Sequence, residues 1–241
     1  MVRRFFIAML AVCLSSGALF AQTVVIDPFS VAQTTINNPT FPTTVGPVLQ
    51  PDGSAAGGFR QVTSNHISGE GAYDLIFDGN TMQSSAGSGV IGSFLLEYGT
   101  QAQLNINATG TNAFQFERAN LDLSAGFTAT ITSGAGAVVA TYVSGPNEIP
   151  GGGLPSSLIT VPFAAFTNGG SLDLTDIDAV TFQFTASQGS TQFLLDNIQL
   201  VSAVPEPTTI AMLGVSGAAA AASIWYRRRK ATRLANAALR R

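Results

Sequence analysis

The sequence predicts an all-β fold, an antiparallel β-sandwich of the jelly-roll type. Between residues 22 and 203, apolar and polar residues alternate with a period of two, as in the segments 113–117 and 181–185. Turn residues, mainly Gly, Asn, Asp and Pro, separate these short segments. No stretch offers twelve residues with amphipathic helical spacing, and charged residues make up only 10% of the chain.

The predicted strands follow one another at short intervals. Segment 104–107 alternates, and segment 113–117 then places two Phe residues on one face. Segments 127–132 and 137–143 predict a hairpin around Ser-Gly-Ala-Gly, and segment 181–185 repeats the Phe pattern. The turns between strands lie at positions 51–53, 78–80, 87–89, 145–147, 150–153 and 168–170.

About ten short strands without helices to cover parallel crossovers favour two packed antiparallel sheets. The 16 Phe residues of the chain, most of them in this region, supply the apolar surface that such a core needs. A right-handed β-helix is the alternative architecture. It requires a short sequence repeat, and we find none.

The predicted domain is strongly acidic. Residues 22–203 contain two basic residues, Arg60 and Arg118, and thirteen acidic ones, which gives a formal charge of −11. Such a domain repels nucleic acid and attracts cations or basic partners, so we expect no nucleic-acid partner. Because both arginines lie in an acidic environment, we expect each to pair with a carboxylate.

The residue types of most catalytic sites are scarce. The only cysteine, Cys13, precedes the domain, which excludes a disulfide, a catalytic thiol or a Cys-ligated zinc there. The only histidine, His66, cannot form a His-based zinc site, and no motif supplies it with triad partners. Four glutamates could serve a glycosidase, but no spacing pairs them; they are Glu70, Glu97, Glu117 and Glu148. We therefore expect no enzyme and no catalytic residues.

Residues 1–21 have the features of a secretory signal peptide. Arg3 and Arg4 precede an apolar stretch over residues 5–14, and small residues permit cleavage after Ala21 or, as second choice, Ala18. This predicts export through the Sec translocon and removal of the segment by signal peptidase. An uncleaved anchor is the alternative, but the apolar run is short for a membrane span. A lipoprotein site at Cys13 would require a small residue at position 12, where the chain has Val.

The C-terminal region contains a proline-bounded motif, an apolar run and a basic cluster in that order. After Pro205-Glu206-Pro207, residues 210–226 are apolar and rich in Ala and Gly, and Arg227, Arg228, Arg229 and Lys230 follow. The apolar run would form a helix about 25 Å long, slightly short of a hydrocarbon core of about 30 Å. The positive-inside rule places the basic cluster in the cytoplasm. We thus predict a weak membrane span, with residues 231–241 as a cytoplasmic stub.

Residues 204–230 resemble the PEP-CTERM sorting signal of bacterial exported proteins. The resemblance implies that an exosortase, a membrane-embedded cysteine transpeptidase, recognises and processes the tail during export. Substrates of this family are typically surface or matrix proteins of bacteria that make exopolysaccharide. The stub of residues 231–241 is longer than usual for the family. An ordinary tail-anchored protein is the alternative. The expected route is transient anchoring in the inner membrane, followed by transfer to the cell surface or release.

Three short segments of the domain, 24–29, 57–60 and 193–198, are similar to jelly-roll domains of such exported proteins, which resemble carbohydrate-binding modules in shape. In those modules, an Asp near the start of the last strand often helps to bind a structural calcium ion together with residues of the first strand. Carried over, this makes Asp27 and Asp196 candidate calcium ligands. Asp196 also has the strand parity of Leu194 and Ile198, where an unpaired carboxylate is costly. The alternative is that Asp196 caps a turn or accepts backbone N–H bonds.

A further acidic group, Asp173, Asp176 and Asp178, lacks the glycine and final glutamate of a calcium loop and predicts a solvated turn. The expected function is that of a non-enzymatic surface or matrix protein with a structural or adhesive role. The alternative is a carbohydrate-binding module in the exopolysaccharide layer. Its sugar-binding rings would be Tyr73, Tyr98 and Tyr142, because the only Trp, Trp225, lies in the tail.

Overall fold

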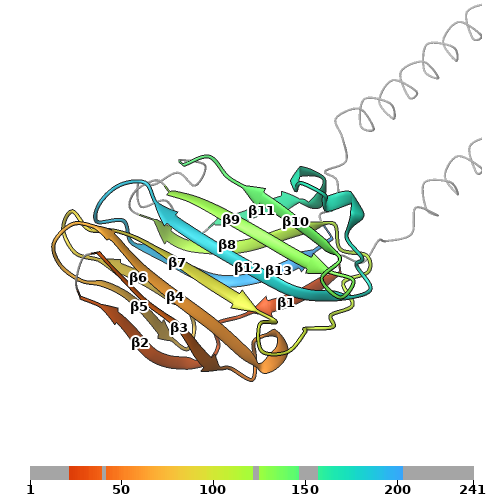
Figure 1. Cartoon of the computed structure of the whole chain (residues 1–241), viewed down its shortest axis with the longest axis horizontal. Coiled ribbons are helices and arrows are strands. Elements are labelled where there is room, and N and C mark those ends of the chain that lie inside the picture. Colours follow the sequence, from red (N-terminus) through yellow and green to blue (C-terminus); the bar gives the residue numbers. More distant parts are fainter. Residues whose placement is uncertain (1–21, 40–41, 122–124, 147–156, 203–241) are drawn as a thin grey trace, which may run out of the picture. The chain divides into compact units, whose positions relative to one another are not determined.

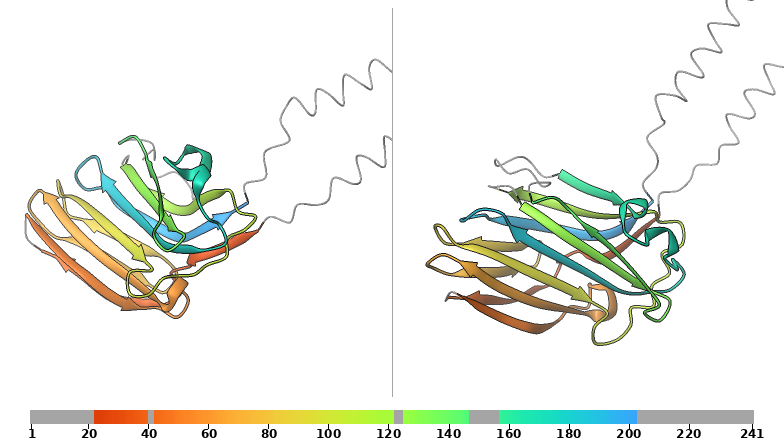
Figure 2. Two further views of the ribbon diagram at one scale, coloured as in Figure 1. Left: turned by 45° about the vertical axis from the view of Figure 1, so that its right-hand side comes forward. Right: turned by 45° about the horizontal axis from the view of Figure 1, so that its top comes forward.

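The computed structural model describes residues 22–39, 42–121, 125–146 and 157–202. Within these ranges, thirteen strands form two antiparallel sheets that pack face to face (Figures 1 and 2). The prediction of an all-β sandwich is confirmed. The predicted signal peptide, sorting tail, membrane span and stub lie outside the described residues. The short helices that are described are not long and apolar enough to cross a membrane.

We call the seven-stranded sheet sheet A and the six-stranded sheet sheet B. Sheet A has the order β11-β8-β13-β6-β5-β2, with β1 added beside β13, and sheet B has the order β10-β9-β12-β7-β4-β3. The strands of sheet A are β1 (Thr23–Asp27), β2 (Ala32–Asn38), β5 (Tyr73–Asp78), β6 (Met82–Ala86), β8 (Ala113–Leu121), β11 (Ser157–Pro162) and β13 (Phe193–Val201). The strands of sheet B are β3 (Thr43–Pro51), β4 (Phe59–Ser68), β7 (Ile91–Tyr98), β9 (Ala125–Ser133), β10 (Val138–Val143) and β12 (Ile177–Ala186). Three short 3₁₀ helices lie in the connections, η1 (Ala56–Gly58), η2 (Phe163–Ala165) and η3 (Gly169–Ser171).

Phenylalanine rings fill the space between the sheets. Phe182 of β12 is fully buried, and its ring centroid lies 4.9 Å from that of Phe116 in β8 and 5.8 Å from that of Phe127 in β9. Phe94 and Phe114 lie within 6.2 Å of the same ring. The alternation that predicted strands at 113–117 and 181–185 therefore also identifies their inward faces.

The predicted hairpin is present and one predicted strand is not. β9 and β10 pair from Ser133↔Val138 to Thr128↔Val143 around the expected turn. Residues 104–107 instead form a loop with one isolated bridge, Ile106↔Ile177, and Asn105 has a left-handed backbone conformation. Leu104 and Ile106 are half-buried and their neighbours exposed, so the alternation persists without a partner strand.

Three edge strands, β2, β3 and β10, make side-chain or loop contacts along their outer edges. At the β2–β3 end, Gln50 Nε2 donates to the Thr34 carbonyl at 3.2 Å and Gln33 Nε2 donates to the Pro51 carbonyl. At the other end of sheet B, Thr167 exchanges two backbone hydrogen bonds with Thr141 of β10. Such contacts reduce the tendency of open edges to pair with other chains.

The first and last strands of the domain lie side by side. β1 pairs with β13 from Thr23↔Val201, and the Ser202 amide donates to the Gln22 carbonyl at 2.8 Å. In Figure 1, the red β1 and the blue β13 show this arrangement. Sheet A is therefore complete only when β13, the last strand of the described residues, has joined it.

Candidate functional site

The outer face of sheet B is rich in threonine and contains a single charged residue, Glu97. On β9 and β12 the buried residues alternate with outward Thr128, Thr130, Thr132, Thr181 and Thr185. We call this surface the threonine face. Its half-buried and exposed members are Thr44, Leu49, Phe59, Gln61, Thr63, Asn65, Leu95, Glu97, Thr128, Thr130, Thr132, Val139, Thr141, Val143, Ala179, Thr181, Gln183 and Thr185.

Strand register arranges the threonine face in rows across the sheet. One row crosses all six strands and runs Thr141, Thr130, Thr181, Glu97, Gln61, Leu49. Neighbours in a row are about 4.8 Å apart, and successive rows are about 6.7 Å apart along the strands. The Thr130 and Thr141 hydroxyl oxygens lie 3.3 Å apart. Each hydroxyl offers one donor and two acceptor positions, so the rows form a regular array of hydrogen-bonding groups.

Charge and aromatic surface are nearly absent from the threonine face. Its one ionisable side chain is Glu97, which accepts a hydrogen bond from Gln61 Nε2 at 2.8 Å. Its one aromatic residue is Phe59, 41% exposed, at the β4 end. In a domain with a formal charge of −11, this is a large neutral surface. It can bind through hydrogen bonds and small apolar contacts rather than through charge.

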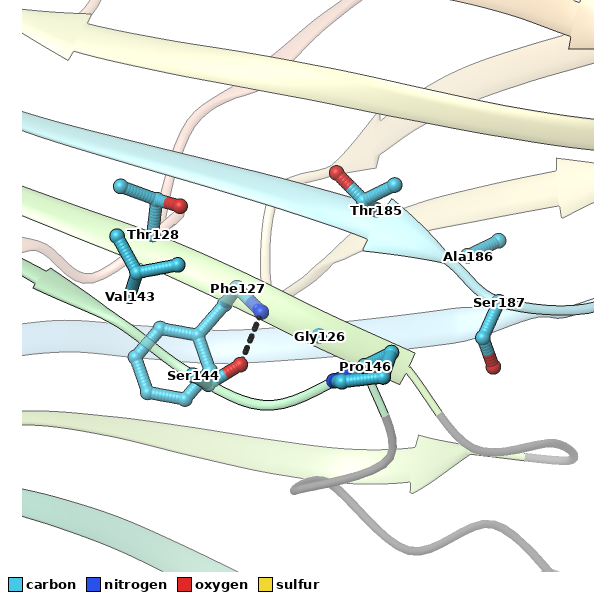
Figure 3. Close-up of a pocket in the computed structure, with 9 residues that line it drawn as sticks. All are labelled: Gly126, Phe127, Thr128, Val143, Ser144, Pro146, Thr185, Ala186 and Ser187. Carbon is cyan, nitrogen blue, oxygen red and sulfur yellow. Dashed lines mark hydrogen bonds between the residues drawn. The ribbon is translucent and has the colours of Figure 1, made fainter.

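A shallow hollow of about 250 Å³ opens at one corner of the threonine face (Figure 3). It is lined by Gly126, Phe127, Thr128, Val143, Ser144, Pro146, Thr185, Ala186 and Ser187. Gly126 allows the backbone at Gly145 to approach β9 closely, since a Cβ on residue 126 would lie 3.0 Å from the Gly145 carbonyl oxygen. The Ser144 hydroxyl accepts a hydrogen bond from the Phe127 amide at 2.7 Å. The lining contains no acid, base or thiol, so it can bind a polar group but offers no acid–base pair.

A buried ionic group, which we call the Arg60 cluster, links the two sheets. Arg60 of β4 donates from Nε and Nη2 to the two carboxylate oxygens of Asp27 in β1, at 2.5 and 2.7 Å. Its Nη2 also donates to Asp52 at 2.7 Å, and the Tyr98 hydroxyl donates to Asp27 at 2.7 Å. The guanidinium carbon lies 4.8 Å from the Phe29 ring centroid and 4.7 Å from that of Phe77. The predicted pairing of Arg60 with a carboxylate is confirmed, while the side chain of Arg118 lies outside the described part.

Burial and neighbouring groups determine the ionisation states of the side chains in the Arg60 cluster. Burial alone would lower the pKa of Arg60, but hydrogen bonds and attraction from Asp27 and Asp52 hold it above the ordinary value. Burial, and then the Asp27 carboxylate, raise the pKa of Tyr98 well above its usual range, so the phenol remains a donor. Burial would raise the pKa of Asp52, but hydrogen bonds from Ser54 and the charge of Arg60 outweigh it and lower the pKa.

We expect Asp52 to make the domain sensitive to acid. Because its folded-state pKa lies below the unfolded value of about 3.9, its stabilising contribution is complete above that pH. The contribution is lost as the pH falls through the folded-state pKa. Urea unfolding between about pH 5 and pH 2 should therefore show a steeper loss of stability in the wild type than in Asp52→Asn. Equal slopes for the two proteins would contradict this assignment.

The surroundings of the two predicted calcium ligands, Asp27 and Asp196, differ from those expected from the sequence. Both oxygens of Asp27 already accept two hydrogen bonds each, from Arg60, Tyr98 and the Phe29 amide. The register between β13 and β8 shifts from Leu195 to Asn197, so Asp196 occupies a bulge. It is half-buried, and the expectation that it shares the parity of the core residue Ile198 is wrong. In the described ranges, no three His, Cys, Asp or Glu side chains gather as a cation site. Calcium binding stays a prediction.

The tyrosines expected to bind sugars are core residues. Tyr73 and Tyr98 are fully buried, and the Tyr142 ring packs 5.5 Å from Phe127 and 5.6 Å from Phe166. The prediction that they form a sugar-binding surface is wrong, because they occupy inward positions of their strands. His66 is likewise buried in β4.

Among the described residues, the acidic side chains weighed as catalytic or metal-binding groups do not gather at one site, and Glu148 lies outside the described part. Glu97 lies on the outer face of sheet B, whereas Glu117 belongs to β8 of sheet A, so these two cannot flank one substrate bond. Asp173 forms the predicted turn by accepting hydrogen bonds from the Thr175 amide and hydroxyl, which lower its pKa. The prediction of a solvated turn is wrong for Asp178, which is buried at the start of β12 and accepts a hydrogen bond from the Gly136 amide.

Two features were not identified from the sequence. The sequence predicts only a turn at Asp52, and the contact of Asp52 with Arg60 depends on how that turn leads from β3 to β4. The threonine face had a visible signal, the Thr-x-Thr-x-Thr spacing at positions 128, 130 and 132. That spacing predicts a strand, but only the strand order shows that threonines of neighbouring strands lie on one face.

Comparison with known families decides the nature of the tail. Residues 203–230 match the PEP-CTERM protein-sorting motif. The chain carries a PEP-CTERM sorting signal. The match agrees with the resemblance seen in the sequence and begins two residues after β13 ends. A PEP-CTERM signal at the C-terminal side of the domain indicates an exported protein. No curated protein matches the sequence.

Several solved β-sandwich domains are distantly similar to this chain. The family 11 carbohydrate-binding module of a Clostridium thermocellum cellulase is 15% identical, with 77% of this chain and 97% of the module covered and a TM-score of 0.38. The family 29 module from Piromyces equi is 8% identical, with 76% and 91% covered and a TM-score of 0.32. The K2 adhesin domain of Lys-gingipain is 15% identical, with 69% and 99% covered and a TM-score of 0.33. These values describe a remote resemblance between sandwiches and identify no ligand for this chain.

Proposed function

We propose that this protein is a non-enzymatic component of the cell surface or extracellular matrix, processed through its PEP-CTERM tail by an exosortase-type transpeptidase. The observation that carries the proposal is the match of residues 203–230 directly after the last strand of the domain. The route uses the Sec translocon and signal peptidase for the N-terminal segment. The tail then anchors the protein in the inner membrane until it is processed.

The order of the strands supports a role for the tail in retaining the chain at the membrane while the domain folds. β13 contacts β1, β6 and β8, so sheet A cannot close before residue 201 has crossed the membrane. The apolar segment 210–226 follows within nine residues. A weak span at this position would retain the chain at the membrane while the last strand joins its partners. Processing after that step would release a folded domain.

The geometry also supports a non-catalytic role. The hollow beside Gly126 has no ionisable side chain in its lining, and Glu97 and Glu117 belong to different sheets. A structural or adhesive role requires only a stable domain and a binding surface. The aromatic core and the Arg60 cluster provide the first, and the threonine face is a candidate for the second.

The sorting motif is tested by changing Pro205, Glu206 and Pro207 together to alanine. We expect the variant to accumulate in the membrane fraction with its tail intact, while the wild type reaches the surface or the medium in processed form. The measurement is the mass and location of the protein in fractionated cells. Thr208→Ala/Thr209→Ala, next to the motif, is the control and should be processed normally. Normal release of the triple variant would contradict the proposed recognition.

A second candidate function is polysaccharide binding within the exopolysaccharide layer. The observation that favours it is the threonine face, which presents eight threonine hydroxyls and three side-chain amides beside a single carboxylate. Sugars are recognised through hydrogen bonds of this kind, usually with the help of an aromatic ring. Binding of the protein to purified polysaccharides tests this function separately from processing.

A further inference from the structure

We propose that the threonine face binds a single extended strand of a neutral polysaccharide, which crosses the strands of sheet B. The inference rests on the second candidate function and adds to it a site and a ligand class. It follows from the charge, the chemistry and the size of this face.

The scarcity of charge on the threonine face favours a neutral polymer. Acidic residues dominate the domain, yet the row that crosses all six strands of sheet B contains one carboxylate and no basic residue. An anionic polymer would meet no cation on this face and would be repelled by the rest of the domain. A neutral polymer has no such penalty. The face therefore selects against acidic polysaccharides.

The hydroxyl and amide groups of the threonine face suit a sugar ligand. Thr141, Thr130 and Thr181 stand side by side on three neighbouring strands. Their hydroxyls can each donate and accept, as sugar hydroxyls do. Gln183 in the next row adds a side-chain amide that is exposed. Phe59, 41% exposed at the end of β4, supplies the one ring on which a sugar could pack.

The size and composition of the threonine face favour a polymer strand over a protein partner. Six strands spaced by about 4.8 Å and four rows spaced by about 6.7 Å cover nearly 800 Å², about the area that one partner contributes to a stable protein–protein interface. The core of such an interface is enriched in aromatic residues, whereas the one ring of this face, Phe59, lies at its margin. A second copy of this chain is therefore a poor occupant. Because β-sheets twist, a single flexible strand can follow the rows better than a flat crystalline surface can.

The hollow beside Gly126 fits this arrangement. Thr128, Val143 and Thr185 line the hollow and also belong to the threonine face, so the two form one continuous surface. At about 250 Å³ it is smaller than most ligand pockets, which range from about 300 to 1,000 Å³. It has room for a single branch or chain end of the polymer rather than for an independent ligand.

The face predicts weak binding at each site. It has one aromatic ring rather than a platform of several, so each copy would bind through modest hydrogen bonds. Many copies on one polymer would bind more strongly through multivalency. A matrix protein present in many copies suits this mode.

The test is affinity electrophoresis of the full chain in detergent through native gels that contain hydroxyethylcellulose, dextran or alginate. We expect the two neutral polymers, or one of them, to retard the wild type, and alginate not to. Gln183→Glu, which adds a charge to the face without changing its shape, should weaken this retardation about tenfold. Thr130→Val/Thr181→Val should weaken it as well, because it removes two hydroxyls but adds no charge.

Gln83→Glu is the matched control. Gln83 lies on the outer face of sheet A between Leu194 and Ile76, as Gln183 lies between Leu95 and Thr128 on sheet B. The Gln83→Glu variant should bind the polymers like the wild type, and all variants should keep the wild-type melting temperature. Equal loss in both Gln→Glu variants would overturn the site, and stronger retardation by alginate would overturn the ligand class. No retardation of the wild type by a neutral polymer would overturn the inference and polysaccharide binding together, but not the proposed processing.

Discussion

Replacement of Arg60 by methionine is expected to destabilise the domain by about 3–5 kcal/mol. The guanidinium is fully buried and joins Asp27 of sheet A to the turn residue Asp52. Its removal leaves the buried carboxylates of Asp27 and Asp52 close together without the cation that they share. The measurement is the free energy of unfolding from urea titration followed by circular dichroism. Since domains are stable by about 5–15 kcal/mol in total, a large part of the stability is lost.

The control for Arg60→Met also neutralises the two carboxylates that Arg60 pairs with. Arg60→Met combined with Asp27→Asn and Asp52→Asn leaves no buried charge, so it should recover part of the lost stability. A cost of about 1 kcal/mol or less for Arg60→Met alone would match an exposed ion pair and would contradict the buried cluster.

Phe182→Ala is expected to cost about 3–5 kcal/mol, because it empties the centre of the aromatic core. The ring of Phe182 has no exposed surface and lies within 6.2 Å of four other phenylalanine rings, which belong to both sheets. The rings around it cannot close such a cavity without moving both sheets. The same urea titration measures the loss.

Phe59→Ala is the matched control for the core substitution. Phe59 is 41% exposed at the end of β4, so its truncation should cost about 1 kcal/mol or less. If the two substitutions cost the same, Phe182 would not occupy the centre that the structure assigns to it.

The sequence predicts those parts of the fold that depend on local patterns. Alternation identifies β8, β9 and β12 and the buried faces of Phe116 and Phe182, because strand side chains point to opposite sides in turn. The Ser-Gly-Ala-Gly turn identifies the β9–β10 hairpin. The scarcity of basic residues is also informative, because each of the two arginines of so acidic a domain is expected to have a carboxylate partner, and Arg60 has two.

The features that depend on strand order are not accessible in the same way. The bulge at Asp196 changes the parity of β13, and nothing in the local sequence marks it. Tyr98 could face either way until the pairing of β7 with β4 and β12 is known. The threonine face requires the same knowledge, since it joins residues from six strands that lie far apart in the chain.

The most direct test of the account is the intact mass of the native protein recovered separately from the cytosol, the membrane and the medium. We expect the extracellular form to begin after Ala21, or after Ala18, and to lack the apolar segment 210–226. The membrane form should retain this segment. A protein found only in the cytosol, with both ends intact, would contradict export and sorting alike.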